Sequence, residues 1–171
     1  MKVLIVMLAL VMTASAVSAQ VGTEPLAWAP EHRALADGLG AAAVAAQAAG
    51  ATWYSVKAWR AGDHAPAYRN LCAALLTEAS VESLKRVIHE TRPDGSDNLS
   101  NPSGHSGMLA ALSGWSFSVS IPITVFGALS RADANKHHLW GPRGAKDIPI
   151  GLAIGAGAQA ACHAFIHQRP S

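Results

Sequence analysis

The stretch Pro102-Ser103-Gly104-His105 combines residue types that could bind an anion and process it. Proline and small residues mark a helix start, and the first backbone N–H groups of a helix have no acceptor inside it. These donors and the positive end of the helix dipole favour a negatively charged ligand. His105 could exchange a proton with the group that carries the anion. Pro-Ser-Gly is also an ordinary turn, so this stretch alone does not establish a site.

Cationic and imidazole side chains flank this stretch at spacings that suit one anion site. Lys85 and Arg92 are seven residues apart, which places them within about 20° on one helix face. Two cations on one face repel each other and suit a shared anion, although a solvated helix end is the better explanation of such a pair taken in isolation. Arg131 precedes His137 by six residues, so a helix must end between them if both serve one site. Asp147 then stands where a helix N-cap is expected.

Taken together, these residues resemble the signature of the type 2 phosphatidic acid phosphatase superfamily. That superfamily also contains the soluble bacterial class A acid phosphatases and the vanadium haloperoxidases. The resemblance covers most of the chain after its first residues, from about Leu35 to Gly157. Its three parts are Lys85-x6-Arg92-Pro93, Pro102-Ser103-Gly104-His105, and Ser130-Arg131-x5-His137 followed by an Asp.

The third part departs from the family pattern at one point. The family places its Asp four residues after the histidine, whereas ten positions separate His137 from Asp147 here, an apparent insertion of six residues. The pattern resumes after Asp147, which is followed by Gly151 and Gly155. We therefore expect the inserted loop to return to its starting point and to restore the contact between Asp147 and the ring of His137.

The resemblance implies an exported phosphatase that hydrolyses phosphate monoesters without a metal or other cofactor. Small esters and lipid phosphates both occur as substrates in the superfamily, and vanadate is the expected inhibitor. A lipid head group would be reached from the aqueous side, through contact with a membrane surface. The implied catalytic residues are His137 as nucleophile, His105 as general acid and base, and Asp147 as the group that orients His137. The implied phosphate ligands are Lys85, Arg92, Ser103, Gly104 and Arg131.

Two other functions remain open at this point. The same residues could bind vanadate for halide oxidation, although the small domain disfavours a haloperoxidase. Alternatively, the insertion has disconnected Asp147, which would leave an inactive protein that binds anions. His163 and His167 are four residues apart on the last expected helix, but no third metal ligand lies at a suitable spacing. Gly151, Gly155 and Gly157 match a phosphate-binding loop poorly and favour close helix packing instead.

The first nineteen residues have the pattern of a secretory signal. Lys2 supplies a basic start, Val3 to Met12 is apolar, and small residues precede a cleavage site after Ala19. This pattern predicts a periplasmic or secreted protein with one domain over residues 20–171. Export would also permit a disulfide between Cys72 and Cys162, but their spacing does not decide this, and a pair of buried free thiols is the favoured alternative.

Composition narrows the choice of partners. Without Lys2 the chain has 12 basic residues (13 − 1) and 11 acidic residues, a net charge near +1 that gives no reason to expect nucleic-acid binding. Charged residues make up 14% of the chain and hydrophobic residues 50%, so a folded core is expected. Nothing in the sequence indicates an oligomeric state.

Helical segments account for most of the chain, and no segment shows the alternation of a strand. We expect a compact all-α bundle of about five to six helices, of the phosphatidic acid phosphatase and haloperoxidase type. The first helix contains Gly38, Gly40 and Gly50, which disfavour a continuous helix. Pro122 is expected at the start of a separate, later helix. The expected helices cover residues 31–60, 65–90, 103 to about 115, 122–133 and 148–165.

Three uncharged segments raise the question of a membrane, at residues 38–56, 106–130 and 148–161. If His105 and Arg131 meet at one site, the chain between them must go out and back, which leaves roughly eleven residues, or about 17 Å, for each leg. This is much shorter than the roughly 30 Å hydrocarbon core of a bilayer. A soluble bundle is therefore the expectation from sequence.

Overall fold

The computed structural model describes residues 30–89, 101–135 and 146–167, and within these ranges all regular secondary structure is helical. The expected all-α architecture is thus confirmed, with five α-helices and one 3-10 turn in the described part of the chain. The predicted signal segment, Arg92 and His137 lie outside the described residues. In chain order the elements are α2 (Pro30–Arg60), α3 (Ala65–Ile88), α4 (Gly104–Ala111), η1 (Ser113–Trp115), α5 (Phe117–Asn135) and α6 (Asp147–His167).

The two longest helices follow the sequence pattern closely. α2 is continuous across its glycines, because a run of alanines around them has the highest helix propensity of any residue type. α3 begins with a proline in its first turn and ends at His89, which adopts the left-handed conformation (φ 48°). The N–H of His89 donates to the carbonyl of Lys85 at 3.1 Å and so caps the last turn.

The start of α5 differs from the expectation. The helix begins at Phe117, and Pro122 lies inside it rather than at its start. The carbonyl of Ser116 accepts the N–H groups of Val119 and Ser120 and fixes the first turn before the proline is reached. The Ser120 hydroxyl also donates to the carbonyl of Ser113. These contacts hold a turn that the proline by itself would disfavour.

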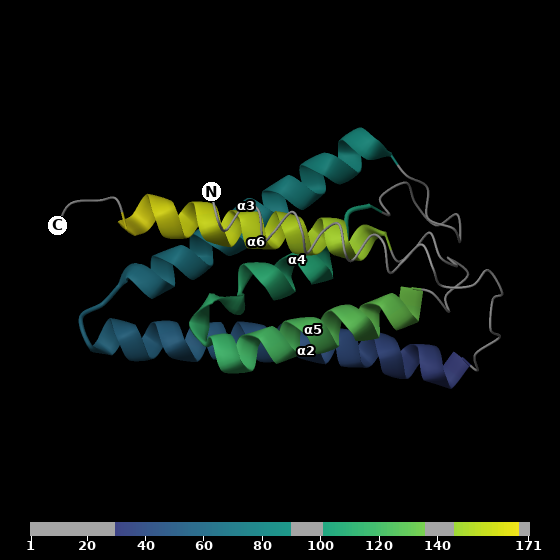
Figure 1. Ribbon diagram of the computed structural model, residues 1–171, viewed down its shortest axis with the longest axis horizontal. Helices are drawn as coiled ribbons and strands as arrows, with labels where there is room; N and C mark the ends of the chain where they lie inside the picture. Colours follow the sequence, from purple (N-terminus) through teal and green to yellow (C-terminus); the bar gives the residue numbers. More distant parts are fainter. Residues whose placement is uncertain (1–29, 90–100, 136–145, 168–171) are drawn as a thin grey trace.

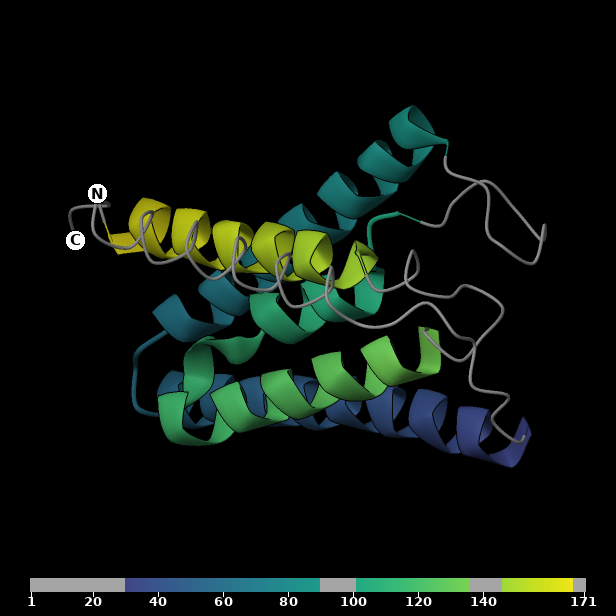
Figure 2. The same ribbon diagram turned by 45° about the vertical axis from the view of Figure 1, so that its right-hand side comes forward.

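α4 is the central helix of the bundle (Figures 1 and 2). It packs against α6 and α3 on one side and against α5 and α2 on the other. The C-terminal ends of α3 and α5 and the N-terminal ends of α4 and α6 all lie toward one end of the bundle, on the right in Figure 1. We call this the site end.

The lengths of the helices between His105 and Arg131 differ from the two equal legs that the sequence-based argument against a membrane assumed. The two legs between His105 and Arg131 are unequal, since α4 has 8 residues and α5 has 19. α4 is much shorter than α2 and α3, which have 31 and 24 residues. In the described part of the chain one helix, Asp147–Ile166, is long and apolar enough to cross a bilayer by length and composition. Its mean hydropathy is 1.3, and 28% of that stretch is buried.

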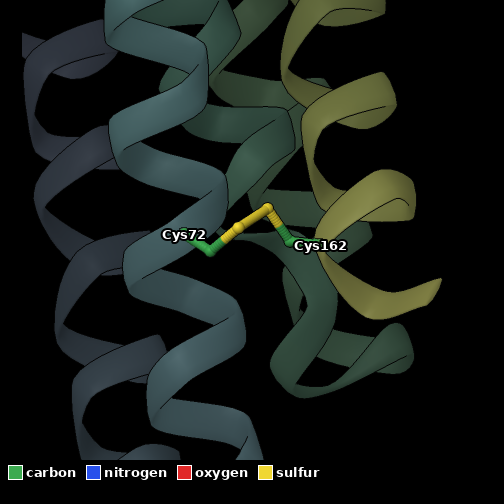
Figure 3. Close-up of a disulfide and its surroundings, with 2 residues drawn as sticks. All are labelled: Cys72 and Cys162. Atoms are coloured by element: carbon green, nitrogen blue, oxygen red, sulfur yellow. A yellow bond between two sulfur atoms is a disulfide. The ribbon is translucent and has the colours of Figure 1, made fainter. Parts of the chain in front are cut away.

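A disulfide joins the two helices on one side of α4 (Figure 3). Cys72 lies on α3 and Cys162 on α6, with 5.9 Å between their Cα atoms. Of the two alternatives that the sequence left open, the structure shows the paired one. Beside the disulfide, Ala73 and Ala111 are fully buried and bring α3 and α4 together.

Candidate active site

The N-terminus of α4 is closed by Ser103. Its hydroxyl oxygen accepts the backbone N–H of Ser106 at 3.4 Å and lies 3.1 Å from the Ser106 hydroxyl, while its carbonyl accepts the N–H of Gly107 at 3.1 Å. Ser103 is therefore the N-cap of α4. Gly104 and His105 supply the first two N–H groups of the helix, which have no acceptor within it. The His105 side chain is exposed at the same end.

Asp147 lies directly beside this helix start. It is the first residue of α6, it is 2% exposed, and its carbonyl accepts the backbone N–H of Ser103 at 3.2 Å. The helix begins at Asp147 itself, one residue earlier than the N-cap expectation. The inserted residues thus do not carry Asp147 away from the Pro-Ser-Gly-His stretch. The ring of His137 is not described, so the contact between the two side chains stays a prediction.

Glycines bring α4 and α6 this close together. A Cβ atom at Gly151 would overlap the carbonyl oxygen of Ser103, and a Cβ at Gly155 would overlap the carbonyl oxygen of Gly107. Backbone therefore packs on backbone along two turns of α6. The expectation that these glycines serve helix packing is confirmed at both positions, whereas a Cβ at Gly157 would have nothing within 4 Å.

Lys85 reaches the site end from α3. Val81 packs against α4, since its Cγ1 would lie 3.8 Å from a Cβ at Gly104. Lys85 follows Val81 by one helical turn on nearly the same face, so it stands just beyond the start of α4. Its ammonium group bonds the carboxylate of Glu82 at 2.9 Å, and its side chain is 17% exposed. The hydrogen bond and charge of Lys85 hold the pKa of Glu82 below its ordinary value.

Arg131 comes to the same level from α5, on the other side of α4. A Cβ at Gly127 would lie 2.8 Å from the Leu109 side chain, which fixes the register of the two antiparallel helices. Arg131 is one turn beyond Gly127, and His105 is one turn before Leu109, so the two belong to one layer. The Arg131 Cδ would lie 3.8 Å from a Cβ at Gly40 of α2, and its side chain is half-buried.

The structure thus brings six of the eight sequence-predicted site residues to one end of the bundle. The other two, Arg92 and His137, lie outside the described residues. The sequence reasoning missed Glu82 as the partner of Lys85, although an acid three residues before a lysine on a helix is a recognisable pairing signal. The described six are Lys85, Ser103, Gly104, His105, Arg131 and Asp147.

A polar cavity lies at the opposite end of the bundle from this site. It has a volume of about 190 Å³, and Tyr54, Arg69 and His163 line it. The Arg69 guanidinium there donates to the carbonyl of Gly114 at 3.1 Å. The cavity lies far from the N-terminus of α4, so it is not part of the predicted site. Among the described residues there is no cluster of three or more His, Cys, Asp or Glu side chains that could hold a metal ion.

Comparisons with known proteins assign no family to the chain. No family model matches it, and neither the curated proteins nor the solved structures gave a match.

Proposed function

We propose that the site end hydrolyses phosphate monoesters through a phosphohistidine, without a metal ion. The observation that carries the proposal is the hydrogen bond between the Ser103 N–H and the Asp147 carbonyl. It joins the second and third parts of the sequence signature in space despite the inserted residues. Lys85 and Arg131 approach the same helix start from opposite sides of α4, which suits a group with negative charge on several oxygens.

In the proposed reaction, the cations and the first N–H groups of α4 bind the phosphate oxygens. A ring nitrogen of His137 attacks phosphorus, forming a P–N bond as the P–O bond of the ester breaks. His105 gives a proton to the departing oxygen. Water then attacks phosphorus, the P–N bond breaks, and His105 takes the proton from that water, which releases inorganic phosphate. In the sequence, His137 comes two residues after the end of α5 and six residues after Arg131, which is half-buried.

Lys85 has a counter-ion that a phosphate must compete with. Its ammonium group bonds the carboxylate of Glu82. A dianionic phosphate places more charge near the ammonium group than one carboxylate does, so it would displace Glu82 when it binds beside α4. Glu82 then holds Lys85 in position between turnovers.

The test is release of phosphate from a chromogenic ester by the purified protein in the presence of a chelator. Activity should be inhibited by vanadate and should fall on the order of a thousandfold in His105→Ala and at least as far in His137→Ala. His138→Ala removes the adjacent imidazole and is the matched control, with activity near that of the wild type. Full activity in His137→Ala would exclude the phosphohistidine. Tight vanadate binding without turnover would favour an anion-binding protein, and peroxide-dependent halide oxidation with vanadate would favour a haloperoxidase.

A further inference from the structure

Polar side chains face inward on α5, and large apolar side chains face outward. Ser120 is fully buried, and the Thr124 hydroxyl donates to the Ser120 carbonyl at 2.9 Å and lies 3.2 Å from the Leu109 carbonyl. In contrast, Phe117 is 83% exposed and Leu129 is 65% exposed. Further exposed apolar residues on the same helix are Val119, Ile121, Val125 and Phe126. A water-soluble bundle has the opposite distribution.

α3 shows the same inverted distribution on the far side of α4. Asn70 and Thr77 are buried against the bundle, while Leu71 and Leu75, the latter 62% exposed, point away from it. These two leucines therefore do not form part of the core. Burying polar groups and exposing leucine to water would both raise the free energy of a soluble fold.

Small residues and interhelical hydrogen bonds hold the interior together. Gly151 and Gly155 form a Gly-x3-Gly pair at which α6 meets the backbone of α4. The fully buried Gln47 of α2 places its amide nitrogen within 3.2 Å of the Leu109 carbonyl and 3.1 Å of the Ser120 carbonyl. Close contact through small residues and amide or hydroxyl bonds across helices is the way in which helices associate in lipid.

Charge is confined to the two ends of the bundle on three of its helices. The sequence has no Asp, Glu, Lys or Arg over residues 38–56 of α2, 117–130 of α5 and 148–166 of α6. At 1.5 Å per residue these stretches are about 28, 21 and 28 Å long. On α3 the uncharged stretch is residues 70–77, about 12 Å, and beyond it the helix diverges from the bundle at the site end (Figure 2).

The end opposite the site has the composition of a membrane interface. Trp53, Trp59 and Tyr68 are all exposed there, close to Lys57 and Arg60. The Lys57 ammonium group lies 5.4 Å from the centre of a Trp53 ring. Tryptophan and tyrosine concentrate at the level of lipid head groups, and exposed lysine and arginine complement anionic ones.

We propose that this bundle is embedded in a lipid bilayer, with the outer face of α5 and the first half of α3 against acyl chains. Figures 1 and 2 show α4 between α5 and α3, so the two apolar faces point in different directions. A second copy of the chain would cover one face and leave the other in water, whereas lipid covers both. The site end lies at the membrane–water boundary. The proposal is independent of any enzymatic activity.

The first experiment is flotation of the full chain with vesicles that contain anionic phospholipid, followed by an alkaline carbonate wash. The wild type should float and remain bound. Leu75→Lys or Phe126→Lys should lower the bound fraction on the order of a hundredfold, because lysine is strongly disfavoured at the centre of a membrane helix. Val87→Lys is the matched control: Val87 is 78% exposed on α3 but lies beside Arg86 at the charged end, so binding should not change.

A second measurement covers the case in which a lysine variant does not fold. Phe126→Cys and Val87→Cys are labelled with a polarity-sensitive fluorophore under non-reducing conditions, which keeps the disulfide intact. On addition of vesicles, the label at 126 should shift to an apolar spectrum and the label at 87 should not. A wild type that stays in solution as a monomer or dimer beside vesicles overturns the proposal. So does a label at 126 that responds no more than the label at 87.

Discussion

On the side of α4 that faces α6, the backbone of one helix packs on glycines of the other, and a disulfide ties α6 to α3. On the side that faces α2 and α5, the contact passes through the amide of Gln47 and the hydroxyl of Thr124. The first side depends on glycines that allow backbone to pack on backbone. The second side also has a close approach at Gly127, but it adds hydrogen bonds from buried side chains. The predicted site draws on both, with Asp147 from the first side and Arg131 from the second.

The largest effect is expected from removing the disulfide. Cys72→Ala combined with Cys162→Ala reopens a loop closed across 90 residues, which should lower the free energy of unfolding by about 4 kcal/mol. Denaturant unfolding followed by circular dichroism measures the change. If the variant does not fold, reduction of the wild type gives the same comparison. A wild type whose stability is insensitive to reductant would contradict the role assigned to this bond.

The glycine contact should be the next most sensitive point. Gly155→Ala places a methyl group against the carbonyl of Gly107, which neither helix can avoid without a backbone shift, so a loss of about 3 kcal/mol is expected. Gly157→Ala is the matched control on the same helix. Its side-chain position is open, and it should raise stability by roughly 0.5–1 kcal/mol through helix propensity. Thermal unfolding of the two variants should therefore shift in opposite directions.

On the other side of α4, Gln47→Leu keeps the volume of the side chain and removes its hydrogen bonds. The Leu109 and Ser120 carbonyls lose a donor, and the Trp115 indole N–H loses the Gln47 oxygen that it bonds at 3.1 Å. The expected loss is about 2 kcal/mol, because buried polar groups are left unpaired. Ser113→Ala removes a local bond to Ala110 and should cost less than about 1 kcal/mol. Equal stability of Gln47→Leu and wild type would show that this side is held by packing alone.

Helix positions were predictable where local chemistry decides them. The proline and serine before Gly104 indicate the start of α4, and the helix expected over residues 65–90 matches α3 to within two residues at its end. The start of α5 was not predictable, because the carbonyl of Ser116 and the distant amide of Gln47 fix the turn before Pro122. Periodicity also does not reveal which face of a helix is buried. Leu75 and Thr77 lie on the same helix, and only the packing of α3 against α4 shows that the threonine is inside.

The sequence signature predicts which residues belong to the candidate site. It does not predict how these residues are arranged in space. Sequence alone left the position of Asp147 dependent on a loop of unknown path. The contact of Asp147 with Ser103 depends on Gly151, which lets α6 approach α4 within backbone distance. That approach is a tertiary property of two helices far apart in the sequence, so no local pattern encodes it.

The smallest effect is expected at the ion pair on the α3 side of the site. Hydrogen bonding to Lys85, the charge of Lys85 and that of Arg86 lower the pKa of Glu82 from its ordinary 4.5, so folding favours the charged carboxylate. This contribution to stability is present above the ordinary pKa and is lost as the pH falls through the lowered one. Glu82→Gln should therefore be slightly less stable than the wild type at neutral pH and indistinguishable from it in acid, as denaturant unfolding at the two pH values would show.

The matched control for this pair is Glu78→Gln, one turn earlier on α3, which removes an acidic side chain and leaves the bond between Lys85 and Glu82 intact. If the proposed phosphatase activity is present, Glu82→Gln should also bind vanadate somewhat more tightly at neutral pH, because the Lys85 ammonium group no longer has to exchange one anion for another. Weaker vanadate binding in Glu82→Gln would indicate that Glu82 positions Lys85 rather than competing for it. The direction of the change in vanadate affinity thus separates a positioning role of Glu82 from a competing one.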